Sequence, residues 1–283
     1  MEMVVQDFGE AALRERDLER LARFRLLDDT FMRVVFRGNL PLAQRVLRTI
    51  TGIGTLVLTG GETQRDLRRA TGSRSPALDA FGTDASGTQY DLEVQSGSDL
   101  EPRRFRYYGS AMDVDALPAG RPYAELPERW LVVVLERDPA GSAQALRHYR
   151  TCAPGGVVLE DGAHLLYANA AYRGDDALGS LMSDFCQADP RLIRDPMLRE
   201  RVQYLKKSEE GVREMCRISD EIRDEGIEIG RRQGLEQGLE QGLKQGLLNS
   251  LRSLMETAHW SAQQAMDALK VPEDQRARYL AMI

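Results

Sequence analysis

Two acidic side chains, Asp79 and Glu93, have the types and the spacing to bind a metal ion together. They lie fourteen positions apart in two segments, residues 76–81 and 88–95, whose composition predicts β-strands joined by a turn. Two carboxylates that face each other repel unless a cation lies between them, and an all-oxygen site favours Mg²⁺ or Mn²⁺. The pair is therefore a candidate metal site.

The turn between the two strands sets their register. Residues 85–87 have the composition of a three-residue hairpin loop. If Gly87 takes the left-handed conformation, Asp84 pairs with Thr88, and counting back along both strands places the two acids directly opposite each other. Their Cβ atoms would then be about 4.5–5.5 Å apart on one face of the hairpin.

The second strand has two different faces. Side chains alternate along a strand, so Asp91 and Gln95 share the face of Glu93, while Leu92 and Val94 point into a core. The alternative interpretation is that the acids form only a solvent-exposed surface of the hairpin.

An Asp on one strand followed by Glu-x-Gln on the next resembles the PD-(D/E)XK nuclease core. The surrounding sequence is similar to one branch of it, the recombination-promoting nuclease and transposase family. Its motifs are matched in order by residues 29–36, 78–79, 90–95, 104–110, 117–120, 123–126, 161–162 and 168–169. The sequence departs from the pattern in two places: no proline precedes Asp79, and Gln95 stands where a lysine is usual.

The resemblance implies a Mg²⁺-dependent DNA endonuclease with an α/β fold. The core would be restriction-endonuclease-like, with a central mixed sheet flanked by helices, followed by an all-helical C-terminal extension. In that role Asp79 and Glu93 hold the metal together with the carbonyl of Val94. Gln95 orients a water molecule, and a lysine in its place is expected to retain or raise activity. Asp29 is the candidate for a further acid on a helix.

The segment 99–115 is predicted to be a helix that carries basic side chains next to the acids. Arg104, Arg106 and Tyr107 are candidates for contacts with DNA phosphates. The alternative is a structural role in which these arginines pair with the acids. Because Gln95 replaces the lysine, a DNA-binding protein that keeps the nuclease fold without cleaving is a second hypothesis, and an oligomeric interaction scaffold is a third.

Composition limits the remaining possibilities. The net charge of −6 over 283 residues argues against a protein that coats nucleic acid, so any DNA contact has to be local. No apolar run approaches the roughly 20 residues that span a bilayer, which predicts no membrane partner. Three widely spaced cysteines fit neither a zinc site nor a disulfide framework, so a reduced cytoplasmic protein is expected. None of the three histidines has a Ser or Cys partner at a recognisable motif, so a hydrolase triad is not supported.

Hydrophobic periodicity predicts the elements that position these residues. The run 130–135 is continuously apolar, as in a strand that is buried on both faces. The expected helices are residues 10–27, 28–36, 41–50 and 99–115, and the expected strands are residues 55–59, 76–81, 88–95, 130–135, 145–150 and 164–169. Composition divides the chain into four predicted regions: an N-terminal amphipathic helix (1–27), the nuclease-like domain (28–207), a glycine-repeat helical arm (208–248) and a small helical module (249–283).

The glycine-repeat arm has a glycine at every fourth position from Gly226 to Gly246. Each glycine costs a helix about 0.5–1 kcal/mol relative to alanine, so the helix needs a compensating contact. We expect that contact to be a second copy of the chain, in a homo-oligomer and most simply a dimer; the alternative is a flexible charged linker. In the tail, Ser261 is predicted to cap one short helix and Pro272 to open another.

Overall fold

The computed structural model describes residues 18–66, 77–97 and 100–283. The chain divides into two compact units between Ile222 and Arg223, and each unit is described here by itself. The first unit is built on one six-stranded mixed sheet with the order β1-β2-β3-β4-β6-β5. Its strands are β1 (Leu58–Asp66), β2 (Ala77–Asp84), β3 (Gln89–Gln95), β4 (Arg129–Leu135), β5 (Leu146–Tyr149) and β6 (Ala163–Asn169).

The sheet combines an antiparallel half with a parallel half. β1, β2 and β3 form an antiparallel meander, and β3, β4 and β6 run parallel to one another. β5 closes the other edge antiparallel to β6. The carboxyl ends of β3 and β4 therefore lie side by side, which is where open α/β sheets usually place their ligands.

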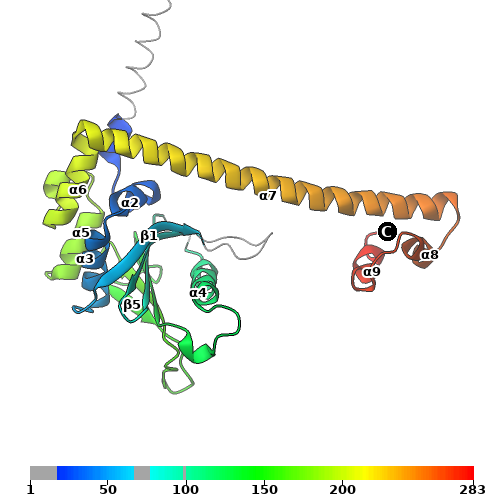
Figure 1. Ribbon diagram of the computed structural model, residues 1–283, viewed down its shortest axis with the longest axis horizontal. Helices are drawn as coiled ribbons and strands as arrows, with labels where there is room; N and C mark the ends of the chain where they lie inside the picture. The colour runs from blue at the N-terminus through cyan, green and yellow to red at the C-terminus, as the bar shows by residue number, and fades with distance from the viewer. Residues whose placement is uncertain (1–17, 67–76, 98–99) are drawn as a thin grey trace, which may run out of the picture. The chain divides into compact units, whose positions relative to one another are not determined.

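Helices cover both faces of this sheet, so the first unit is an α/β sandwich (Figure 1). One face packs against four helices, which are α2 (Asp29–Phe36), α3 (Leu40–Thr51), α5 (Ala177–Phe185) and α6 (Pro196–Lys207). The other face packs against α4 (Pro102–Ala116). The unit also contains the short 3₁₀ turns η1 (Tyr123–Glu125) and η2 (Pro190–Leu192), the helical residues 18–23 and the first part of the helix that begins at Glu209, whose Met215 and Ile218 join the same core. The predicted α/β class is confirmed at this level.

The central strand β4 shows why the sheet needs helices on both sides. Val132 and Val134 point into the core beneath α2, α3, α5 and α6, whereas Leu131 and Val133 point toward Phe105 of α4. The prediction that this strand is buried on both faces is confirmed.

The helix ends follow local signals in the sequence. The side chain of Asn39 caps α3 by accepting a hydrogen bond from the N–H of Leu42, and Gly52 ends the helix in the left-handed conformation. Before α2, residues 18–23 are helical and the helix ends four residues before the predicted 27; predicted helical residues 10–17 lie outside the described part of the chain.

The first strand differs from the prediction. β1 begins at Leu58 rather than at residue 55 and runs to Asp66. Arg48 on α3 donates a hydrogen bond to the carbonyl of Leu56, so the preceding segment is bound to a helix instead of to the sheet. The strand itself contains Gly61, where a Cβ would lie 2.5 Å from the side chain of Leu40 and 2.9 Å from the carbonyl of Phe81. The close approach requires glycine and hides the strand from composition-based prediction.

The glycine repeat lies in a single helix, α7 (Glu209–Thr257), so the predicted helical arm is confirmed and the flexible-linker alternative is wrong. In the second unit, α8 (Ala262–Ala268) and α9 (Glu273–Leu280) pack on the end of α7 around Leu251 and Met266. Ser261 caps α8 in a capping box, and Pro272 directly precedes α9, as predicted. Residues 249–257 continue α7 instead of forming a separate helix. Within the described ranges, no helix is both long and apolar enough to cross a bilayer.

Candidate active site

The β2–β3 hairpin has the predicted register. The main chain of Asp84 donates a hydrogen bond to the carbonyl of Thr88 at 3.1 Å, and Gly87 is left-handed with φ of 88°. Ala80 pairs with Leu92 further along, so the next position places Asp79 opposite Glu93. A three-residue loop of this kind requires the positive φ that glycine adopts without strain.

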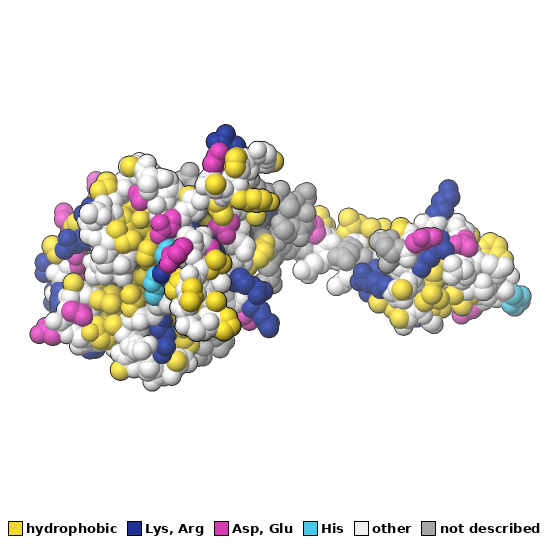
Figure 2. All heavy atoms as spheres, turned by 90° about the horizontal axis from the view of Figure 1, so that it is seen from below, with side chains coloured by type: hydrophobic (Ala, Val, Ile, Leu, Met, Phe, Trp, Pro, Cys, Tyr) yellow, Lys and Arg dark blue, Asp and Glu magenta, His cyan; other side chains and the backbone are white. Residues whose placement is uncertain are grey.

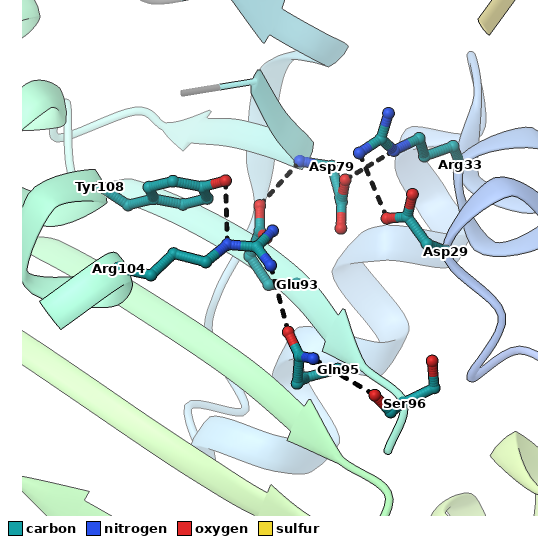
Figure 3. A network of polar contacts seen from close by, with 8 residues as sticks. All are labelled: Asp29, Arg33, Asp79, Glu93, Gln95, Ser96, Arg104 and Tyr108. Carbon is teal, nitrogen blue, oxygen red and sulfur yellow. Dashed lines mark hydrogen bonds and ion pairs between the residues drawn. The ribbon is translucent and has the colours of Figure 1, made fainter. Parts of the chain in front are cut away.

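The two acids contact each other across the hairpin (Figure 3). The main-chain N–H of Asp79 donates a hydrogen bond to Oε1 of Glu93 at 3.1 Å. The relative exposure is 1% for Asp79 and 0% for Glu93. The alternative interpretation, an acidic surface exposed to solvent, is therefore wrong.

Asp91 is a third buried acid on the same face. It is completely buried, and among the described residues its carboxylate has no hydrogen-bond partner other than the neighbouring carboxyl of Glu93. Oδ2 of Asp79 is also buried and accepts no hydrogen bond from the described residues. Buried polar atoms without partners are rare and costly, so these oxygens are available to a metal ion or to a shared proton.

Arg33 on α2 is the cation nearest to Asp79. Its Nε donates to Oδ1 of Asp79 at 2.8 Å, and its Nη2 lies 3.2 Å from Oδ1 of Asp29, one helical turn earlier. The side chain of Asp29 is 49% exposed, in contrast to the buried cluster. The candidate helix-borne acid thus joins the network through Arg33 (Figure 3).

Arg104 on α4 contacts the other acid. Its Nη2 lies 3.5 Å from Oε2 of Glu93, its Nη1 donates to Oε1 of Gln95 at 3.1 Å, and its Nε donates to the hydroxyl of Tyr108 at 3.0 Å. Gln95 in turn donates from Nε2 to the carbonyl of Ser96 at 3.2 Å. Arg104 therefore contacts an acid of the cluster, as the alternative interpretation expected of it.

The other two residues predicted to bind DNA lie elsewhere on α4. A helix turns about 100° per residue, so the faces that carry Arg106 and Tyr107 differ from the face that carries Arg104 and Tyr108. Arg106 and Tyr107 are both exposed. The structure therefore brings only Arg104 of the predicted trio to the acids.

Burial dominates the electrostatics of the cluster. It raises the pKa of Asp79 to about 7 against the opposing effect of Arg33. Burial also raises the pKa of Asp91 and of Glu93 well above their ordinary values, and the charge of Asp79 adds to both shifts. The raised pKa values favour protonated carboxyls, because three ionised carboxylates facing two arginines would leave an excess negative charge. A bound cation would balance that charge and favour ionisation.

Asp79 and Glu93 suit Mg²⁺ or Mn²⁺ better than they suit a metal ion that is fully enclosed by protein ligands. Among the described residues, no group of three or more His, Cys, Asp or Glu side chains is arranged to hold a metal ion. Mg²⁺, however, keeps several water ligands and is commonly bound through only one or two carboxylates. Asp79 and Glu93 supply that donor set, and the free Oδ2 of Asp79 is available for it.

Two of the three histidines, His148 and His164, form a separate cluster on the surface of the first unit (Figure 2). Nε2 of His148 and Nδ1 of His164 are 2.9 Å apart, and Nε2 of His164 is 2.8 Å from Oε1 of Glu128. Trp130 stacks on His164 with ring centroids 3.9 Å apart. These two histidines contact each other and an acid, and the contacts described for them include neither a serine nor a cysteine.

Sequence reasoning missed three members of the network: Arg33, Asp91 and Tyr108. Strand alternation placed Asp91 on the correct face, and its burial was the missing information. Arg33 and Tyr108 belong to the network through contacts between distant parts of the chain. No family model matches this sequence, and no curated protein and no solved structure matches it either. The function is therefore inferred from the site itself.

Proposed function

We propose that this protein is a Mg²⁺-dependent DNA endonuclease, built on a restriction-endonuclease-like core, that hydrolyses phosphodiester bonds. The observation that carries the proposal is the pairing of Asp79 with Glu93 across the hairpin, in a buried cluster of carboxyl groups whose raised pKa values a bound cation would lower. The mixed sheet supports it, since the acids lie beside the carboxyl ends of parallel strands. The sequence resemblance to the recombination-promoting nuclease family is the second support and suggests a link to recombination or mobile elements.

Each residue of the network has a role in this proposal. Asp79 and Glu93 hold the metal, which when bound would polarise the phosphoryl oxygen and lower the pKa of a bound water. Gln95 orients the attacking water through its amide. Arg104, 3.1 Å from Gln95, supplies the positive charge that lysine provides in resembling nucleases. Asp29 acts through Arg33, which positions Asp79.

Nicking of supercoiled plasmid tests the proposal. The wild-type protein should nick DNA with Mg²⁺ or Mn²⁺ and lose the activity in EDTA. Asp79→Asn should lower the rate by at least about 100-fold, since it removes one of two charged ligands. Asp175→Asn is the matched control, because Asp175 is exposed outside the network. Equal nicking by both variants would show that the acids are not the catalytic site.

A second candidate function is a DNA-binding protein that keeps this fold without cleaving. The observation in its favour is that Arg33 and Arg104 already lie against the acids that would hold the metal. In this role the acids and arginines form a structural network. Binding of duplex DNA with equal affinity in EDTA and in Mg²⁺, without any nicking, would support it against the endonuclease.

We also propose that α7 joins copies of the chain. A Cβ built on any of the six repeat glycines meets no atom within 4 Å, so this strip is open within the chain. Leu235, Leu239 and Leu243 are exposed in the same segment. Glycine at every fourth position allows close backbone approach of a second helix, which would compensate for the low helix propensity. An interaction scaffold without enzymatic activity would use the same surface.

A further inference from the structure

A cavity lies beside Gln95, where β3 and β4 end. Its volume is about 350 Å³, within the range of small-molecule sites. The residues that line it come from the ends of the two strands and the segments that follow them: Gln95, Gly97, Leu100, Leu135, Glu136, Arg137, Asp138 and Pro139. Gln95 also contacts Arg104 of the acid network, so the cavity and the candidate active site share a wall.

Both acids of the cavity wall are already neutralised. Oε1 of Glu136 lies 3.1 Å from Nη1 of Arg25, and Oε2 accepts a hydrogen bond from the N–H of Gly97 at 3.0 Å. Oδ2 of Asp138 is 2.9 Å from Nη2 of Arg147. The hydrogen bond from Gly97 and the ion pair with Arg25 lower the pKa of Glu136, and hydrogen bonds from Arg147 lower the pKa of Asp138. Neither acid leaves a charge that would attract a cation.

Within the described ranges, Arg137 is the lining residue whose charge is engaged by no hydrogen bond or ion pair, and its side chain is exposed. The neighbouring Glu136 is engaged by Arg25 and Gly97, and the charge of Arg137 is the last of the causes that lower the pKa of Glu136. The cavity as a whole therefore favours an anion, and a guanidinium group is well suited to a phosphate.

The rest of the wall is apolar. Leu100, Leu135 and Pro139 line the cavity together with the amide of Gln95. Apolar side chains next to a single unpaired guanidinium suit a ligand with a flat or apolar body and one phosphate. A nucleotide unit has this combination, with a base or sugar joined to a phosphate.

We propose that this cavity holds one nucleotide of the DNA strand next to the cleaved bond, with its base or sugar against Leu100, Leu135 and Pro139 and its phosphate on Arg137. The inference rests on the proposed function, and it names the part of the substrate that the site recognises. In this proposal the main phosphate contact is made by Arg137, which follows the end of β4, and not by the predicted Arg106 and Tyr107 on α4.

Fluorescence anisotropy of a labelled DNA duplex tests the inference, measured in EDTA and again with Ca²⁺ over a range of salt concentrations. Arg137→Gln should weaken binding about tenfold, the effect of one lost charged hydrogen bond. The slope of log K against log salt should become shallower by about 0.9, the contribution of one phosphate. Arg199→Gln is the control, because Arg199 is an exposed arginine on α6 without a described ion pair.

A second variant tests the cavity without changing its charge. Leu100→Trp narrows it and should weaken binding while the salt slope stays at the wild-type value. Circular dichroism verifies that both variants fold. Wild-type affinity in Arg137→Gln would overturn the inference and leave the endonuclease proposal intact. Binding that depends on Arg137 without plasmid nicking would support the cavity and defeat the endonuclease. A wild-type protein that binds no DNA in either buffer would overturn the inference.

Discussion

The main-chain N–H of Asp79 donates a hydrogen bond to the carboxylate of Glu93 at 3.1 Å, while the carboxylate of Asp79 turns to Arg33. The two acids are therefore not equivalent. Glu93 accepts from a backbone group of the neighbouring strand and lies 3.5 Å from Arg104 of α4, whereas Asp79 pairs with Arg33 of α2. Each acid is held in place by a different part of the fold, which makes their substitutions distinguishable.

Substitutions at Glu93 should show this backbone contact in the free energy of unfolding. Glu93→Gln keeps an oxygen that accepts the hydrogen bond from Asp79, and Glu93→Ala removes it. A buried N–H without a partner costs about 1–3 kcal/mol, so we expect the alanine variant to be less stable than the glutamine variant by that amount. Urea unfolding curves measure the difference. Equal stability of the two variants would show that the contact contributes nothing.

Divalent cations should stabilise the folded protein. A cation that displaces protons from the carboxyl cluster binds only the folded state, so the midpoint of thermal unfolding should rise with Mn²⁺ concentration. At a hundred times its dissociation constant the gain is about 2.7 kcal/mol. Glu93→Gln should remove most of this response, and Asp175→Asn should keep it. A wild-type protein whose unfolding midpoint ignores Mn²⁺ and Mg²⁺ would contradict the metal site.

The stability of the metal-free protein should fall as pH rises from about 4 to about 7. Burial raises the pKa of Asp79 from 3.8 to about 7, so in this range the folded state keeps a proton that the unfolded state has lost. The contribution of Asp79 to the free energy of unfolding is complete below the unfolded-state pKa of 3.8 and is lost as pH rises through the folded-state pKa of about 7. Its magnitude is on the order of a few kcal/mol. Chemical unfolding in EDTA at several pH values measures the slope. Asp79→Asn should flatten it, and an unchanged slope in that variant would assign the effect to other groups.

The sequence was sufficient to predict the register of the hairpin and the order of the main strands along the chain. Gly87 and the loop length set the register, and the apolar run of β4 identified a strand buried on both faces. These features depend on neighbours in sequence, where turn chemistry and alternation are strong signals.

The partners of the acids depend on contacts between distant segments, which no local pattern predicts. Arg33 is 46 positions from Asp79, and its role follows from how α2 packs beside β2. On α4 the prediction chose three basic or aromatic residues that are close in sequence, but the helix directs only Arg104 to the acids. The predicted first strand stopped at residue 59 because Gly61, which close packing against Leu40 requires, has a low strand propensity.

Arg104 changes the expectation for a lysine at position 95. Sequence resemblance alone predicts that Gln95→Lys retains or raises activity. In the structure Nη1 of Arg104 lies 3.1 Å from the Gln95 oxygen, so a lysine would place a second cation against it. We therefore expect Gln95→Lys to lower the nicking rate about tenfold, because like charges at this distance repel by one or more kcal/mol. The double variant Gln95→Lys/Arg104→Gln should recover part of the rate, because it again has one cation and one amide at these two positions. A Gln95→Lys single variant that exceeds the wild type would refute this role of Arg104.

Substitution of the repeat glycines of α7 by leucine should raise the stability of the helix and weaken the association of copies, so the two effects can be told apart. Among the described residues, and apart from the neighbouring residues and the helix's own backbone, no atom lies within 4 Å of a Cβ built on Gly234 or Gly238. Leucine at both positions therefore fits the isolated helix without a clash, and it raises the helix propensity by somewhat less than 1 kcal/mol per site. Any loss of assembly must then come from contacts with another copy of the chain.

If the glycine strip packs against a second copy, the double variant Gly234→Leu/Gly238→Leu should dissociate to monomers, because the added side chains separate the two helix backbones. Light scattering coupled to gel filtration measures the mass, and circular dichroism should show equal or higher helix content. Gly234→Ala/Gly238→Ala is the matched control, since alanine raises helix propensity with far less bulk and should disturb assembly less. A wild-type monomer, or an oligomer that survives both leucines, would show that the strip does not join copies of this chain.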